Sequence, residues 1–381
     1  MPRKNTGSVR PDTQRPDKWR AVVTIDGKST VRRFDTEAEG WAWINEQKYL
    51  YDKNLYIPPS DLTLGVWLVE WLRVYVAPNI RIRTKERYMV TIEHLQPLYK
   101  YKLQELDLHT ISKFFAICTL TESSKNKAFK LLKAALKQAA ISKMLYSNPL
   151  EGAKPPKPPE NELPIMNVED INIILGYCKA HNRYKRYYPI FFMLANTGAR
   201  IGEMLALEWQ SVNLAEQEIT IKQSVEYSTT YGTRIVEPKT KAGTRTIPIS
   251  TAAVNLLKSI NKGTKFVFPH YRGDGPHGVN NISRIWRKLF ELYNGQKDAD
   301  GNLLLSPAEQ IPYRNIHSLR HTHATALIGA GNVSLIDLSK YLGHAKVSHT
   351  LDLYGHAMKK NTKAIAESVN NIYSDMDSNK K

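Results

Sequence analysis

The 381-residue chain has the composition of a globular protein and a strongly basic charge balance. Hydrophobic residues make up 42% and charged residues 24%, which excludes a collagen, a low-complexity chain and a wholly disordered chain. There are 54 Lys and Arg against 36 Asp and Glu, so the formal net charge is +18. This surplus predicts a polyanionic partner, most simply nucleic acid; a soluble and merely well-charged protein is the alternative.

The sequence contains no segment typical of membrane or secreted proteins. No run of about 18 apolar residues is present, so we expect no transmembrane helix and no membrane partner. Residues Met1–Asn5 are polar and basic without an apolar stretch behind them, which argues against a secretory signal. Cys118 and Cys178 lie in apolar contexts typical of reduced core residues, and we therefore expect a cytoplasmic protein.

Residues 1–55 are expected to form a small sheet followed by one helix. Trp19–Ile25 and Ser29–Phe34 have the character of strands, and Asp26-Gly27 between them is a hairpin turn signal. Thr36-x-x-Glu39 is a capping box, which indicates the start of a helix. The pattern predicts a three-stranded sheet with one helix against it.

The sheet half of this unit is basic. Residues 1–34 contain nine Lys and Arg and three Asp and Glu. A small sheet can lie in a DNA groove with the side chains of one face at the base edges. We therefore predict DNA contacts from Arg20 and Arg32, and a solvated basic face is the alternative.

Residues 56–151 show only helical periodicity. An apolar stripe from Leu64 to Leu72 marks the first helix. Three further helices are expected at Arg83–Leu98, His109–Ile117 and Ser124–Ser142. One side of the last helix is almost purely cationic, which suits a phosphate backbone better than the mixed charges of an ordinary surface. The candidate DNA contacts here are Lys127, Lys130, Lys133 and Lys137, with a second patch at Arg81, Arg83, Lys85 and Arg87.

Five prolines in residues 152–164 predict an extended interdomain linker. Residues 165–381 are expected to form a mixed α+β, mostly helical domain with a C-terminal tail. Its expected elements are a helix from Asn167, a buried run at Tyr188–Ala195, a strand at Glu218–Val225, a small antiparallel sheet in which Gly232–Val236 and Thr244–Ile249 flank a turn at 241–243, and helices from Val279 onward.

Six basic or nucleophilic residues of this domain stand at turns and helix ends. Arg200 lies in T-G-x-R-x-x-E, and His317 and Arg320 lie in H-x-L-R. His344 ends L-G-H, and Tyr354 follows ten residues later. Lys241 occupies the predicted hairpin turn, where Lys239 is its competitor.

These residue types suit the cleavage of a phosphodiester by transesterification. Arg200 and Arg320 can each hold nonbridging oxygens with two N–H groups, which stabilises the negative charge of the transition state without a metal. A tyrosine hydroxyl such as that of Tyr354 becomes a nucleophile only in a cationic site or beside a base. Lys241 is the candidate acid for the leaving oxygen, and His317 and His344 can bind phosphate or move a proton.

Several neighbours are given structural roles instead. Tyr354 by itself could be a core tyrosine, and Glu203 more plausibly orients an arginine than does chemistry. His321 and His323 have no Cys or carboxylate at metal-ligand spacing, so we expect a structural or DNA-adjacent role and no metal. Without a P-loop or G-x-G-x-x-G after a strand, no nucleotide cofactor is expected.

With these motifs in this order, the chain resembles the tyrosine recombinases, specifically the integrases of phages and conjugative transposons. The resemblance implies an arm-binding domain at 1–55, a SAM-like core-binding domain at 56–151 and a catalytic domain at 165–381. It also implies a 3′-phosphotyrosine made by Tyr354, and a homotetramer that recombines two DNA duplexes through a Holliday junction. By the same resemblance, the tail from about residue 357 docks on a neighbour, and an excisionase and a host DNA-bending protein are partners in a bacterial nucleoid.

Two other functions remain open. A type IB topoisomerase has the same chemistry, and a non-catalytic DNA-binding regulator would share the basic surface. The attachment sites, the crossover length, the direction of the reaction and the choice between phage and transposon are not readable from the residues.

Overall fold

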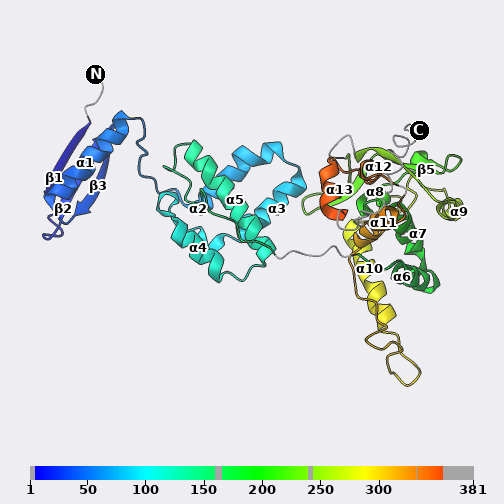
Figure 1. The fold of residues 1–381 in the computed structure, drawn as a ribbon. Coiled ribbons are helices and arrows are strands. Elements are labelled where there is room, and N and C mark those ends of the chain that lie inside the picture. The colour runs from blue at the N-terminus through cyan, green and yellow to red at the C-terminus, as the bar shows by residue number, and fades with distance from the viewer. Residues whose placement is uncertain (1–4, 159–164, 239–242, 332, 355–381) are drawn as a thin grey trace, which may run out of the picture. The chain divides into compact units, whose positions relative to one another are not determined.

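The computed structural model describes residues 5–158, 165–238, 243–331 and 333–354. The chain divides into two compact units, Met1–Glu160 and Asn161–Lys381 (Figure 1). This division falls inside the predicted linker at 152–164. The predicted fold class is confirmed: the chain is mostly helical, with a three-stranded sheet near its N-terminus and further strands in the second unit.

The first unit begins with the antiparallel sheet β1 (Thr6–Pro11), β2 (Trp19–Ile25) and β3 (Lys28–Phe34), in that order. Asp26 and Gly27 both have left-handed backbones, with φ of 50° and 78°, as the Asp-Gly hairpin signal requires. Helix α1 (Glu37–Asp52) covers one face of the sheet (Figure 1). The Thr36–Glu39 capping box is present in both directions, which explains why α1 begins at residue 37.

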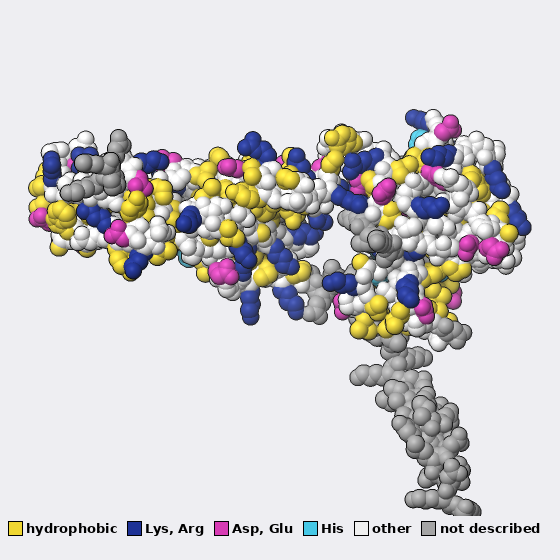
Figure 2. All heavy atoms as spheres, turned by 90° about the horizontal axis from the view of Figure 1, so that it is seen from above, with side chains coloured by type: hydrophobic (Ala, Val, Ile, Leu, Met, Phe, Trp, Pro, Cys, Tyr) yellow, Lys and Arg dark blue, Asp and Glu magenta, His cyan; other side chains and the backbone are white. Residues whose placement is uncertain are grey.

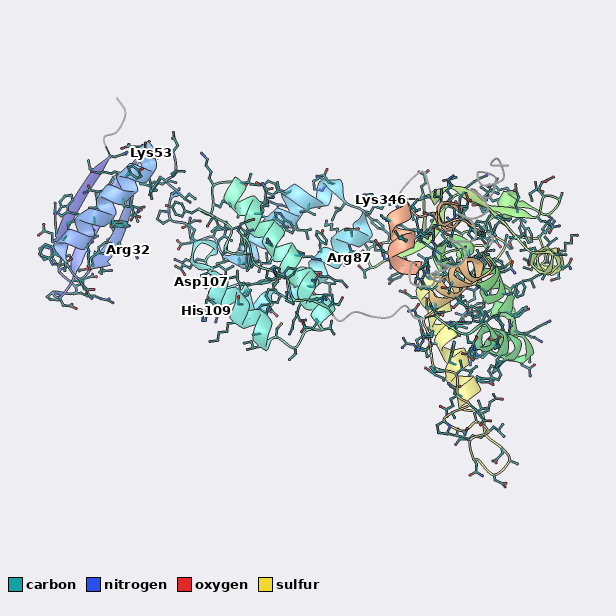
Figure 3. The ribbon with its side chains drawn as sticks, viewed as in Figure 1. Arg32, Lys53, Arg87, Asp107, His109 and Lys346 are labelled. Carbon is teal, nitrogen blue, oxygen red and sulfur yellow. The ribbon has the colours of Figure 1, made fainter. Side chains whose placement is uncertain are left out.

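Strand register places the two predicted DNA contacts of this sheet on opposite faces. Ala21 is buried under α1 and pairs with Arg32, so Arg32 lies on the helix side, with its guanidinium 5.5 Å from the Phe34 ring centroid. Arg20 precedes Ala21 and faces the other way, because successive side chains of a strand alternate. Its cross-strand partners are Arg10 and Arg33, which makes that open face the more basic one. Figure 3 labels Arg32 on β3.

The remainder of the first unit is helical. Its elements are α2 (Leu64–Trp71), a π-helical turn η1 (Leu72–Val76), α3 (Ile82–Glu93), α4 (Leu108–Ile117) and α5 (Glu122–Ile141), with short 3₁₀ turns at Ala77–Asn79 (η2), Gln96–Leu98 (η3) and Leu103–Glu105 (η4). The predicted helix Arg83–Leu98 stops at Glu93 because Pro97 cannot continue the hydrogen-bond ladder. Buried Trp67 ties α2 to α5 by donating from Nε1 to the Ala135 carbonyl at 3.0 Å. This core is separate from the smaller one between the N-terminal sheet and α1.

Helix α5 carries the cationic side that was predicted, with one exception. Lys127, Lys130 and Lys137 are exposed, whereas Lys133 is half-buried and donates from Nζ to the Ala153 carbonyl at 3.2 Å. Asn126 makes a similar bond to the Pro156 carbonyl at 2.8 Å. The first residues of the proline-rich segment therefore lie along α5. Lys and Arg side chains are distributed over both units in Figure 2, and Arg87 is labelled on α3 in Figure 3.

The second unit is built around one large core that includes Phe191 of α7 and Trp286 and Phe290 of α10. Its elements are α6 (Val168–Ala180), η5 (Lys185–Tyr187), α7 (Tyr188–Thr197), α8 (Ile201–Leu205), η6 (Trp209–Ser211), β4 (Val212–Asn213), β5 (Glu218–Ile221), β6 (Ser224–Ser228), β7 (Gly232–Val236), β8 (Arg245–Pro248), α9 (Thr251–Ser259), α10 (Val279–Asn294), α11 (Ser318–Gly329), α12 (Leu335–Leu342) and α13 (Val347–Tyr354). The helices predicted near Asn167 and beyond Val279 are confirmed, and the predicted buried run at Tyr188–Ala195 is part of helix α7.

The predicted pairing of the strands on either side of residues 241–243 is wrong. Strand β7 pairs with β6, and β8 pairs with β5 in the sheet β4-β5-β8. The expected single strand Glu218–Val225 is two strands, interrupted where the Gln223 side chain donates to the Ala206 carbonyl at 2.8 Å and to Glu208 Oε1 at 2.7 Å. The two resulting strands, β5 and β6, therefore pair with different strands, β8 and β7.

Among the described helices, none is long and apolar enough to span a bilayer.

Candidate active site

Two left-handed glycines end helices just before predicted site residues. Gly198 (φ 59°) ends α7, and Arg200, two residues later, is the N-cap of α8. Gly343 (φ 69°) ends α12, and His344 follows directly. A side chain at Gly198 would also approach His323 Cδ2 to 2.7 Å, so this turn requires glycine twice over. The T-G and L-G motifs therefore aim Arg200 and His344 out of helix ends.

Arg320 on α11 joins those two helix ends. Its side chain is 2% exposed, and it donates to the Gly198 carbonyl at 3.0 Å and the Leu342 carbonyl at 2.7 Å. Its Nη2 also lies 2.8 Å from His344 Nε2. Burial, and then the charge of Arg200, lowers the pKa of Arg320. The charged form of Arg320 is therefore less stable here than in water, and a bound anion would stabilise it.

Arg200 is held by a buried carboxylate. Its Nη1 donates to Glu203 Oε1 at 2.8 Å, and its Nη2 is 3.4 Å from the Gly343 carbonyl. Glu203 also accepts from both terminal nitrogens of Arg245, at 2.8 and 3.2 Å. Burial raises the pKa of Glu203, but the hydrogen bonds and charges of Arg245 and Arg200 outweigh it, and the pKa falls to about 2. Glu203 orients arginines, as expected, and stays ionised.

Replacing Glu203 with glutamine is expected to destabilise the protein by about 3–5 kcal/mol, because Arg245 is left buried with an unpaired charge. The folded pKa of Glu203 lies below its ordinary value of 4.5. Its contribution is therefore present above pH ~4.5 and is lost as the pH falls towards 2. Urea unfolding at pH 7 and pH 3 measures both effects.

The matched control is Glu216→Gln, at an exposed position of the same unit, where a change within about 0.5 kcal/mol is expected. Equal stability of the two variants at pH 7 would contradict the bridging role of Glu203.

The two predicted histidines differ in setting. His344 is buried, and its Nδ1 lies 2.8 Å from Thr350 Oγ1, a bond that fixes the ring with Nε2 towards Arg320. His317 remains exposed at the start of α11. Partial desolvation by the surrounding protein, together with His321 and nearby guanidiniums, lowers the pKa of His317 to about 4, so its ring is neutral at pH 7.

Tyr354 ends α13 in a small core with Ala324, Leu338 and Leu342, and its side chain is 1% exposed. Its hydroxyl lies 2.8 Å from His321 Nδ1. Burial raises the pKa of Tyr354, while the charges of Arg320 and Arg200 act in the opposite direction. The side chain therefore packs as a core tyrosine does, and at the same time it lies within the field of both arginines.

Sequence reasoning underestimated two residues. His321 follows Arg320 directly and lies four residues after His317, which is the signal that it shares their end of α11. Arg245 comes just after the predicted turn and reaches both Glu203 and the Tyr341 carbonyl, at 2.7 Å for the latter. For His323 a structural or DNA-adjacent role was expected, and its ring nitrogens lie 3.0 Å from the Ala195 carbonyl and 3.0 Å from Tyr341 Oη.

Three predicted features lie outside the described residues: Lys241, its competitor Lys239, and the tail from about residue 357. Within the described ranges, no group of three or more His, Cys, Asp or Glu is placed to hold a metal ion.

Two solved structures that match this chain are integrases bound to DNA. A Tn1549 transposon integrase in complex with a circular intermediate DNA matches with a TM-score of 0.68 at 20% identity, over 81% of this chain and 99% of that one. A lambda integrase tetramer bound to a Holliday junction matches with a TM-score of 0.56 at 14% identity, over 92% of this chain and 95% of that one. The fold is that of the tyrosine recombinase integrases.

Comparisons of the amino-acid sequence also point to integrases and tyrosine recombinases. The family model "Phage integrase family" matches residues 164–361, more than half of the chain. The "Tyrosine recombinase XerC-like" protein of Caldanaerobacter subterraneus subsp. tengcongensis is 27% identical, over 93% of this chain and 96% of that protein. The transposase from transposon Tn916 of Enterococcus faecalis is 26% identical, over 51% of this chain and 48% of that protein. The chain therefore belongs to the phage integrase family of tyrosine recombinases, enzymes that cleave and join DNA.

Proposed function

We propose that this protein is a site-specific recombinase that integrates and excises a mobile element through a 3′-phosphotyrosine intermediate and a Holliday junction, acting at the bacterial nucleoid. The observation that carries the proposal is the arrangement around Arg320. Its guanidinium contacts the helix end before Arg200 and contacts His344, while the next residue of α11 contacts Tyr354. Residues from 200 to 354 thus meet at one end of α11.

Each residue has a role in the proposed reaction. Arg200, Arg320 and His344 bind the nonbridging oxygens of the scissile phosphate and stabilise its growing negative charge. The Tyr354 oxygen attacks phosphorus as the bond to the 5′-oxygen breaks, and that oxygen takes a proton from Lys241. His317 donates a hydrogen bond to the phosphate. Rejoining is the reverse reaction with another 5′-hydroxyl, and the phosphotyrosyl bond conserves the energy for it.

The first unit supplies DNA binding in this proposal. Residues 1–55 bind arm-type sites through the open face of the sheet, which carries Arg10, Arg20 and Arg33. Residues 56–151 bind the core site through α5 and the patch at the start of α3. The active assembly is a homotetramer, by analogy with the lambda integrase tetramer on a Holliday junction. An excisionase and a host DNA-bending protein complete the set of partners.

Replacing Lys130 with alanine is expected to reduce the salt dependence of DNA binding, since an exposed lysine on a phosphate contributes about 0.9 to the slope of log K against log [salt]. The matched control is Lys133→Ala on the same helix, whose ammonium group is already bonded to the Ala153 carbonyl. It should change the slope by less than half as much. Fluorescence anisotropy between about 50 and 200 mM salt measures both. A slope for Lys130→Ala equal to that of the wild-type protein would remove Lys130 from the DNA interface.

Trapping the intermediate tests the proposed chemistry. A duplex from the end of the element, nicked just beyond the scissile phosphate, releases its short 5′-hydroxyl fragment, so a covalent complex accumulates. We expect a denaturant-resistant adduct whose modified peptide contains Tyr354. Strand exchange between two specific sites, rather than relaxation of any plasmid, separates a recombinase from a type IB topoisomerase. No adduct on any end sequence would favour the non-catalytic regulator.

A further inference from the structure

We propose that His321 is the general base that takes the phenolic proton of Tyr354 when that tyrosine attacks DNA. This inference rests on the proposed function, because it assigns a role relative to the nucleophile. Its basis is the short contact between His321 Nδ1 and Tyr354 Oη, at 2.8 Å, between two side chains that are 8% and 1% exposed. The reacting oxygen is thus already in contact with an imidazole.

A tyrosine buried in an apolar core does not ionise readily, because its anion loses the solvation that water provides. Tyr354 is in this situation: Ala324, Leu338 and Leu342 surround it. The guanidiniums of Arg320 and Arg200 favour the anion but cannot accept a proton. A group that does accept one is needed at the moment of attack, and His321 is the imidazole in contact with the oxygen.

The position of His321 on α11 also suits a proton acceptor. It follows Arg320, so the residue that binds phosphate and the residue that contacts the nucleophile are adjacent on one helix. The rings of His317 and His321 are perpendicular, with centroids 4.8 Å apart. Because His317 is exposed, the pair lies between the buried hydroxyl and the solvent side of the site. The other charged groups that act on His317 are Arg320 on α11, Arg200 just before α8 and the Glu203 carboxylate on α8.

The proposed step balances as follows. The O–H bond of Tyr354 breaks and an N–H bond forms at His321 Nδ1, which converts a neutral imidazole with its proton on Nε2 to the imidazolium. The bond between Tyr354 Oη and phosphorus forms, the bond from phosphorus to the 5′-oxygen breaks, and that oxygen receives its proton from Lys241. Rejoining reverses each transfer, so His321 returns its proton to the tyrosine.

Two variants separate a base from a residue that only positions the tyrosine. His321→Asn keeps a polar atom near the place of Nδ1 but has no useful basicity, and His321→Ala removes the contact altogether. We expect both to slow single-turnover adduct formation by about 10²–10⁴-fold with unchanged DNA binding. The wild-type rate should rise with pH through the titration of an imidazole, and the Asn variant should lose that step. If the Asn variant kept nearly the wild-type rate while the Ala variant did not, His321 would be a positioning residue.

A substrate with sulfur in place of the 5′-bridging oxygen identifies which proton transfer is affected. A thiolate leaves without protonation, so this substrate should restore cleavage to Lys241→Ala and not to His321→Asn. Rescue of His321→Asn would make His321 part of the acid pathway and overturn the proposal. Wild-type rates in both His321 variants would also overturn it, while an adduct at Tyr354 would leave the proposed function intact.

Thermal unfolding shows whether the variants fold. His323→Asn, two residues further along α11, is the control, because His323 contacts Ala195 and Tyr341 and not the nucleophile. It is expected to lower the melting temperature without changing the pH dependence of adduct formation. A pH profile altered equally by His323→Asn and His321→Asn would show a general effect of α11 packing and would refute the specific role.

Discussion

Replacing Tyr354 with phenylalanine is expected to abolish the covalent protein–DNA adduct and leave DNA binding unchanged. The substitution removes the only oxygen of that side chain and keeps the ring that packs against Ala324, Leu338 and Leu342. The loss should be complete within detection, because no other group supplies the bond to phosphorus. Denaturing electrophoresis with the nicked duplex measures the adduct, and a mobility-shift assay measures binding.

The stability of this variant provides an internal check. It loses one buried hydrogen bond, to His321, and leaves an imidazole nitrogen to find another partner. A destabilisation of about 1–3 kcal/mol is therefore expected. This is less than the free energy of unfolding of a typical domain, about 5–15 kcal/mol, so the variant should still fold. An adduct formed by the phenylalanine variant would refute the assignment of Tyr354 as nucleophile, whatever its stability.

Replacing Arg320 is expected to give the second largest loss, a fall in cleavage of about 10³-fold or more, with little change in DNA binding. In the proposed function, DNA binding is spread over many Lys and Arg side chains, whereas the transition state depends on this guanidinium. The Arg320→Lys variant retains a positive charge but cannot make the two parallel N–H bonds to a phosphate that a guanidinium makes. Adduct formation and binding affinity, measured side by side, give the two effects.

Arg320→Ala changes stability as well as chemistry, because it also leaves the Gly198 and Leu342 carbonyls without the donor that Arg320 supplies. Each unsatisfied buried group costs about 1–3 kcal/mol, so the alanine variant should be clearly less stable than the lysine variant. If the binding affinity of Arg320→Lys fell as far as its cleavage rate, Arg320 would be a docking residue and not part of the reaction.

The N-terminal sheet illustrates which local features the sequence makes readable. The Asp-Gly turn and the Thr36–Glu39 capping box depend on residues a few positions apart, and both occur where predicted. The prediction that Arg20 and Arg32 both contact DNA from one face of the sheet did not take the alternation of strand side chains into account. Phe34 is apolar and lies two residues after Arg32, so alternation puts both on the face that packs on α1. The strand pattern contained this information.

The strands of the second unit show where local patterns fail. Residues 218–225 alternate like one strand, and nothing nearby in the sequence predicts a break. The break arises because Gln223 donates hydrogen bonds to residues 206 and 208, which tertiary packing brings to it. Strand pairing in this region therefore depends on contacts across the domain. The prediction that Gly232–Val236 pairs with Thr244–Ile249, its neighbour along the chain, was wrong.

The sequence by itself determined the helix ends at which Arg200 and His344, two of the predicted site residues, lie. Motifs such as T-G-x-R and L-G-H encode glycine-capped helix termini, and these form from interactions within a few residues. Only the tertiary structure decided which groups touch. Arg320 reaches carbonyls at Gly198 and Leu342, and His321 reaches Tyr354 across 33 positions of the chain. The physical reason is that a side chain's partner is set by how helices pack around a shared core, and sequence separation carries no record of that distance.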